Sequence, residues 1–152
     1  MENYAKTILS SYMQLNGVIT QIENLIKKKA KNSFYLRCDV VSFSEQLIAL
    51  GEIRKDLIEL KQITETVLNS IKPYDKILIC YKYFGIVPQI EEFDHTSRNY
   101  FRKQVKALEN FAKKLIELGY NEEWFKTKYL KIAFISGVYQ TTLLEQGKKH
   151  VR

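Results

Sequence analysis

The spacing of apolar side chains in the first thirty residues limits the fold more than any other feature of this chain. Apolar residues recur there at intervals of 4, 3, 4, 3 and 4, at Ile8, Tyr12, Leu15, Ile19, Ile22 and Ile26. A period of about 3.5 residues puts them all on one side of an α-helix, as in helices that pack along a partner helix. Residues 4–31 are therefore predicted to form one long amphipathic helix.

A second apolar stripe predicts a second long helix, which begins at Ser42 or Ser44 and ends near Ile71. Ser42 and Glu45 have the spacing of a capping box, in which two side chains bind free backbone amides at a helix start. Residues 34–42 are interpreted as a loop or a partial helix. Because two long helices with a short link usually form an antiparallel hairpin, residues 1–72 are predicted to be a coiled-coil-like helical hairpin.

The chain after residue 72 is predicted to hold shorter helices. Proline suits the first turn of a helix and glycine the position after its last turn. The expected helices are Pro73 to Gly85, Pro88 to Phe93, Thr96 to Leu118, and one last helix from Asn121 through Val138, before a frayed tail from Gly147. The predicted fold class is thus all-α: a long antiparallel hairpin (1–72), then a helix-turn-helix bundle with a C-terminal helix (73–152).

Composition places this chain among globular proteins of a reducing compartment. Hydrophobic residues make up 45% of the sequence, which is enough for a core. The N-terminus lacks the basic start and apolar run of a signal peptide, and no apolar run is long enough to span a bilayer. Cys38 and Cys80 are isolated from each other, which favours two buried thiols, with a single disulfide as the alternative. We expect a cytoplasmic protein that does not enter a membrane.

Residue patterns of catalysis and of cofactor binding are missing from the sequence. His95 and His150 are the only histidines, and neither has a metal-ligand spacing with cysteine or carboxylate residues. No phosphate-binding glycine loop occurs. We therefore expect no catalytic, cofactor-binding or metal-binding residues and no enzyme activity, although a cleft can also assemble distant residues into a catalytic site.

Positive charge is concentrated in one predicted helix. The net charge is +7, and residues 96–118 alone hold six Lys or Arg against two Glu. A basic balance favours anionic partners such as nucleic acids, acidic proteins or membrane surfaces. The helix over residues 96–118 is therefore the first candidate for a binding surface.

The short helix 88–93, a tight turn and the basic helix 96–118 have the layout of a helix-turn-helix, whose second helix enters the DNA major groove. Arg98 lies in the N-terminal half of this second helix. Spacings of three and four put further polar residues on one face, at His95, Asn99, Arg102, Lys103 and Lys106. The alternative is an ordinary amphipathic helix with a solvated polar face.

The residue types on this face suit DNA. Arginine and asparagine pair bidentately with guanine and adenine edges, and lysine suits phosphates. Backbone amides at a helix start can also meet a phosphate, and here that start holds His95, Thr96 and Ser97. The opposite face is expected to pack inside the protein, with Phe101, Val105 and Leu108.

Two segments resemble a known family of DNA-binding domains. Ile71 to Phe84 (IKPYDKILICYKYF) looks like the first helix of a sigma-70 region 4-type domain. Ser97 to Ala112 (SRNYFRKQVKALENFA) resembles the recognition helix of sigma-like phage late-gene transcription regulators. The resemblance implies transcription regulation on double-stranded DNA. The N-terminal hairpin and the helix that holds Trp124 lie outside it and are candidates for dimerisation or for contact with RNA polymerase. The sequence departs from the family at Pro88 to Phe93, where the helix before the turn is short and acidic.

The resemblance also implies which side chains face DNA: Arg98, Asn99, Arg102, Lys103 and Lys106. Two other functions stay open. One is a helical protein–protein interaction module that uses the hairpin of residues 4–71, for example to form a homodimer. The other is binding of RNA or of a membrane surface, for which the sequence offers only its charge.

Overall fold

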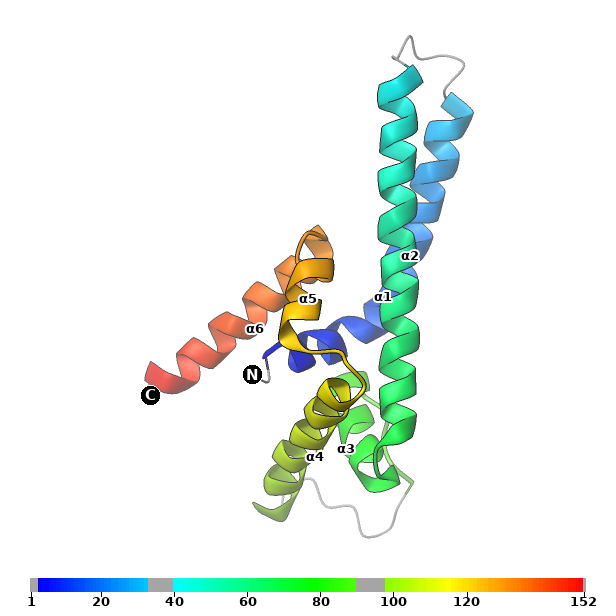
Figure 1. Cartoon of the computed structure of the whole chain (residues 1–152). Helices are drawn as coiled ribbons and strands as arrows, with labels where there is room; N and C mark the ends of the chain where they lie inside the picture. Colours follow the sequence, from blue (N-terminus) through cyan, green and yellow to red (C-terminus); the bar gives the residue numbers. More distant parts are fainter. Residues whose placement is uncertain (1–2, 33–39, 90–97, 152) are drawn as a thin grey trace. The chain divides into compact units, whose positions relative to one another are not determined.

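The computed structural model describes residues 3–32, 40–89 and 98–151. These residues form helices and no strand, so the predicted all-α class is confirmed. Along the chain (Figure 1) the helices are α1 (Asn3–Asn32), α2 (Val40–Ser70), α3 (Pro73–Phe84), α4 (Arg98–Glu117), α5 (Glu122–Tyr129) and α6 (Ala133–Val151). None of the helices in these ranges combines the length and the apolarity that crossing a bilayer requires.

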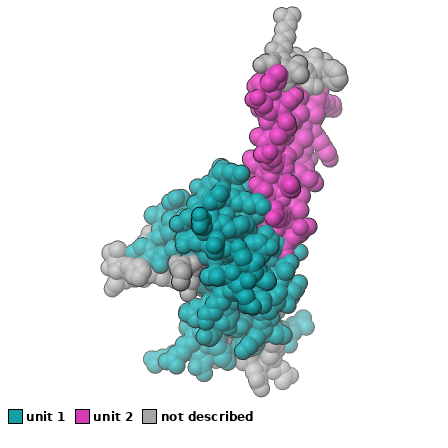
Figure 2. All heavy atoms as spheres, viewed as in Figure 1, with its two compact units in different colours: residues 1–13, 63–152 teal, residues 14–62 magenta. Residues whose placement is uncertain are grey.

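The chain divides into two compact units, coloured teal and magenta in Figure 2. Unit 1 comprises Met1–Met13 and Ile63–Arg152, and unit 2 comprises Gln14–Gln62. These limits differ from the boundary that the sequence suggests at residue 72. The proposed division into domains 1–72 and 73–152 stays a prediction.

Unit 2 is a pair of antiparallel helices. Arg54 Nε donates a hydrogen bond to Glu23 Oε1 over 2.8 Å, and Lys29 Nζ donates one to Gln46 Oε1 over 2.9 Å. The later residue of α1 meets the earlier residue of α2, which defines the antiparallel direction. Apolar side chains at one end of this unit are buried: Leu15, Ile19, Leu57 and Leu60.

Unit 1 joins the start of α1 and the end of α2 to the remaining helices. The Tyr4 side chain is 1% exposed. Its hydroxyl donates to the backbone carbonyl of Tyr120 over 3.1 Å, and its ring centroid lies 5.8 Å from that of Phe125. Large side chains from α1, α3, α4 and α5 are fully buried in this unit: Ile8, Leu9, Leu78, Ile79, Phe111, Leu115, Phe125 and Tyr129.

Local signals fix several helix ends as the sequence predicts. Gly85 follows α3 with a φ of 67°, and Gly119 follows α4 with a φ of 94°. Both values lie in the left-handed region, which glycine adopts without a steric penalty. Asn121 caps α5, because its Oδ1 accepts a hydrogen bond from the backbone N–H of Trp124 over 2.9 Å. The predicted helix ends at these residues are confirmed.

The predicted last helix is wrong, because two helices occupy this segment. α5 ends at Tyr129, and α6 begins at Ala133 and continues to Val151 through the tail expected to be frayed. The N–H of Ile132 donates to the Tyr129 carbonyl over 3.0 Å, which closes a tight turn between them. Phe125 and Ile135 are both fully buried on either side of this turn. Their burial explains why the apolar pattern reads as one helix while the backbone breaks.

Two other predicted helix starts need correction. α2 begins at Val40, so Ser42 lies inside the helix and does not cap it. Pro88 and Gln89 are not helical, and the rest of the predicted short helix, up to Phe93, lies outside the described residues. The predicted start of α4 at Thr96 lies outside them as well.

The cap of α5 gives a direct test of these assignments. Asn121→Ala should lower the free energy of unfolding by about 1 kcal/mol, because the Trp124 amide loses its acceptor. Ser42→Ala should change it by less than about 0.5 kcal/mol, because Ser42 is exposed within α2. Urea unfolding of both variants measures the two values. Equal losses would contradict the assigned positions of these residues.

Candidate nucleic-acid interface

Two polar contacts, one buried and one partly buried, connect α4 to α3, which lies beside it in Figure 1. Gln104 is 5% exposed, and its Nε2 donates to the backbone carbonyl of Leu78 over 2.6 Å. Asn110 Nδ2 donates to Asp75 Oδ2 over 2.9 Å, and Asp75 is also buried. Because buried polar groups are costly without a partner, these contacts favour a single rotational setting of α4.

The buried face of α4 follows directly from this setting. Its members recur at intervals of one, three and four residues and are Gln104, Ala107, Leu108, Phe111, Ala112 and Leu115. Gln104 Nε2 also lies 3.0 Å from the Tyr100 hydroxyl, one turn earlier on α4. The hydrogen bond from Gln104 to α3 therefore belongs to the same face as the apolar core.

Basic side chains occupy the opposite side of α4. We call Arg98, Arg102, Lys106 and Lys113 the basic face; all four are exposed. Arg102 and Lys106 are two residues before and after Gln104, so each lies about 160° around the helix axis from it. Among the described residues, no carboxylate forms an ion pair with Arg98, Arg102 or Lys106. Their charge is therefore presented to solvent.

The other predicted site residues are placed as follows. Asn99 and Lys103 are exposed on α4, toward one edge of the basic face. Lys103 Nζ lies 5.1 Å from the ring centroid of Tyr74 on α3, which is a cation–π contact. Three further predicted residues lie outside the described part of the chain: His95, Thr96 and Ser97.

Phe101 and Val105 contradict the sequence expectation that they pack inside. Their side chains are 63% and 56% exposed, whereas Leu108 is only 5% exposed, as expected. Phe101 and Gln104 thus lie in the environments that the other residue type usually takes. Sequence patterns miss this arrangement because they assign glutamine to the surface and phenylalanine to the core.

A second cluster of positive charge lies near the end of α1. Lys27, Lys28 and Lys31 are exposed there, and Lys29 binds Gln46. This cluster is in unit 2, while the basic face of α4 is in unit 1. The two clusters provide alternative sites for an anionic partner, and experiments must distinguish them.

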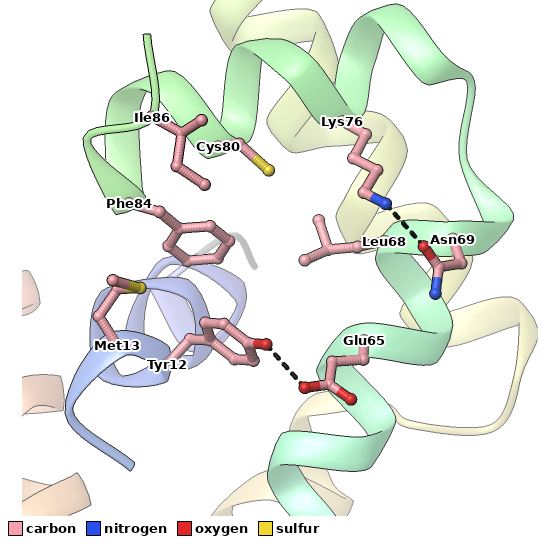
Figure 3. A pocket seen from close by; sticks show the side chains of 9 residues that line it. All are labelled: Tyr12, Met13, Glu65, Leu68, Asn69, Lys76, Cys80, Phe84 and Ile86. Atoms are coloured by element: carbon pink, nitrogen blue, oxygen red, sulfur yellow. Dashed lines mark hydrogen bonds between the residues drawn. The ribbon is translucent and has the colours of Figure 1, made fainter. Parts of the chain in front are cut away.

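Unit 1 also contains a cavity of about 280 Å³, shown in Figure 3. Tyr12 donates to Glu65 Oε1 over 2.7 Å, and Lys76 Nζ donates to Asn69 Oδ1 over 2.7 Å. The rest of the wall is mainly apolar and contains Met13, Leu68, Cys80, Phe84 and Ile86. The volume is just below the usual range of small-molecule sites. The sequence did not predict this cavity because its wall comes from three separate helices.

The chemistry of the cavity does not favour catalysis. Burial raises the pKa of the Cys80 thiol, and a protonated thiol is a poor nucleophile. The described residues contain no group of three or more His, Cys, Asp or Glu side chains arranged to hold a metal ion.

Comparisons with protein families, with curated proteins and with solved structures find no match to this chain. The features that bear on function are therefore the geometry and charge of α4 and the resemblance of residues 71–84 and 97–112 to sigma-like domains.

The contact between Gln104 and Leu78 can be tested by its effect on stability. Gln104→Leu keeps most of the side-chain volume but removes the donor, so the free energy of unfolding should fall by about 1–3 kcal/mol. Gln140→Leu on α6 is the matched control, because Gln140 is exposed and should change stability by less than about 0.5 kcal/mol. Equal effects in urea unfolding would mean that the buried hydrogen bond does not hold α4.

Tyr12 predicts a specific pH dependence of stability. Burial and the hydrogen bond to Glu65 raise the pKa of Tyr12 from 10.0 to about 12. The folded state therefore keeps the hydroxyl proton more tightly than the unfolded state, and this stabilisation is present below pH 10.0 and is lost as the pH rises to about 12. Over that interval, urea unfolding should show a larger loss of stability for the unmodified protein than for Tyr12→Phe. Parallel losses would contradict the raised pKa.

Proposed function

We propose that this chain binds double-stranded DNA through the basic face of α4 and acts as a transcription regulator of sigma-like descent. The observation that carries the proposal is the arrangement of Arg98, Arg102 and Lys106. They are exposed, share one side of a helix, and form no ion pair with a carboxylate of the described residues.

The dimensions and chemistry of an α-helix with such a face suit the DNA major groove, which admits one helix. Arginine pairs bidentately with guanine O6 and N7, and lysine binds phosphates. Rigid support matters, because a side chain can read a base only if its helix keeps one orientation. The contacts of Gln104 and Asp75 supply that support.

The sigma-like part of the proposal is supported by the resemblance in sequence. Its two segments, residues 71–84 and 97–112, coincide closely with α3 and with the N-terminal three quarters of α4. The two helices also pack against each other. RNA polymerase is proposed as a partner of the segments outside the resemblance, the N-terminal hairpin or the helix that holds Trp124. In the segment that corresponds to the intervening helix of the family pattern, Pro88 and Gln89 are not helical, and residues 90–93 lie outside the described part of the chain.

A second candidate function is protein–protein interaction through unit 2. Its large apolar side chains are partly exposed: Leu25 is 41%, Val41 63% and Ile48 61% exposed. Exposed apolar residues on a helical hairpin favour association with another helical surface. Such an interface would most simply join two copies of this chain, and a homodimer is compatible with DNA binding by α4.

DNA binding is tested by removing two charges from α4. Arg98→Ala combined with Arg102→Ala should abolish gel shifts of duplex genomic fragments, because the charged side chains nearest the groove are lost. Where weak binding remains, its dependence on salt should have a smaller slope, because the protein brings two fewer positive charges to the duplex. Binding is measured at two salt concentrations, and circular dichroism checks the fold.

The matched control is Lys27→Ala combined with Lys28→Ala, which removes the same charge from unit 2. This control should keep its affinity for the duplex. Unchanged affinity in the arginine variant, or equal losses in both variants, would contradict a specific DNA site on α4.

A further inference from the structure

Phe101 and Val105 form an exposed apolar pair beside the arginines of the basic face. They are 63% and 56% exposed and are separated by one helical turn, so their side chains are neighbours on the surface. Val105 lies seven residues after Arg98, about 20° from it around the helix axis. Any partner bound by the arginines therefore also meets apolar surface.

Phe101 packs against Tyr100, which itself contacts Gln104. Its ring centroid lies 5.3 Å from that of Tyr100 in an edge-to-face contact. The Tyr100 hydroxyl in turn contacts Gln104, which is bound to the Leu78 carbonyl. A chain of contacts thus connects the exposed ring to the buried anchor of α4, and it limits the freedom that Phe101 loses on binding.

The chemistry of this surface indicates what it contacts. An occupant must carry negative charge for Arg98 and Arg102 and must also offer apolar groups to Phe101 and Val105. The major groove offers both, because phosphates flank it and the C5-methyl group of thymine is the apolar group on its base edges. We propose that Phe101 and Val105 contact thymine methyl groups and make DNA binding by α4 selective for thymine. This inference rests on the proposed function.

An anionic membrane surface would also combine negative charge with apolar groups, but the helix does not fit it well. Helices that lie in a membrane interface insert a broad apolar face, whereas the broad apolar face of α4 is buried within unit 1. Glu109 also lies on the side of the basic face, seven residues after Arg102. Its carboxylate would be repelled by anionic lipid, while carboxylates can accept hydrogen bonds from cytosine N4 in the major groove.

Replacing thymine by uracil tests the inference, because the two bases differ in the major groove only by the C5-methyl group. One set of genomic fragments is amplified with dTTP or with dUTP, and each product competes for the full-length protein in gel shifts. The unmodified protein should bind the thymine fragments about fourfold more tightly for each methyl group that becomes buried. Phe101→Ala with Val105→Ala should bind both products alike.

The control is Ile116→Ala, which removes a 49% exposed apolar side chain farther along α4 and should keep the preference for thymine. Equal binding of both DNAs by the unmodified protein would overturn the inference and leave the proposed function standing. A preference that persists in the double variant would also overturn it. Absence of binding to either DNA would contradict the proposed function itself. Binding to phosphatidylserine vesicles that depends on Phe101 would overturn the inference and identify a membrane surface, in place of DNA, as the partner of α4.

Discussion

The hydrogen bond from Gln104 to the Leu78 carbonyl, 2.6 Å long and buried, is the interaction on which the candidate site depends. Residues on a helix keep fixed angles to one another, so anchoring Gln104 also determines where every other side chain of α4 points. It directs Arg102 and Lys106, each about 160° around the helix axis from Gln104, outward. This buried hydrogen bond therefore determines which charged side chains α4 presents at the surface.

Features that depend on local chemistry could be predicted from the sequence. Apolar periodicity located the long helices, and Gly85, Gly119 and Asn121 marked helix ends by their own conformation or hydrogen bonding. Features that depend on tertiary contacts could not be predicted in this way. A glutamine in the core and a phenylalanine on the surface reverse the usual preferences of both residues, and the break after Tyr129 is hidden within a continuous apolar pattern.

The candidate site also has some features that the sequence predicts and others that depend on tertiary contacts. The exposed basic residues of α4 could be found from charge and spacing, because long charged side chains are rarely buried without a partner. The apolar pair beside them could not, because sequence patterns assign phenylalanine and valine on a helix to the core. The cavity lined by Tyr12, Glu65 and Lys76 could not be predicted from the sequence either, because its wall brings together α1, α2 and α3. Positive charge alone does not select α4, because the exposed lysines near the end of α1 are also basic.

The most direct measurement is lysine modification of the full-length protein with and without duplex DNA, read residue by residue by mass spectrometry. Lys106 and Lys113 lie on the basic face of α4, whereas Lys27 and Lys28 lie in unit 2, and all four are exposed in the free protein. If DNA occupies the basic face, duplex should protect Lys106 and Lys113 and leave Lys27 and Lys28 reactive. Protection of Lys27 and Lys28 with Lys106 and Lys113 still reactive would contradict a DNA site on α4.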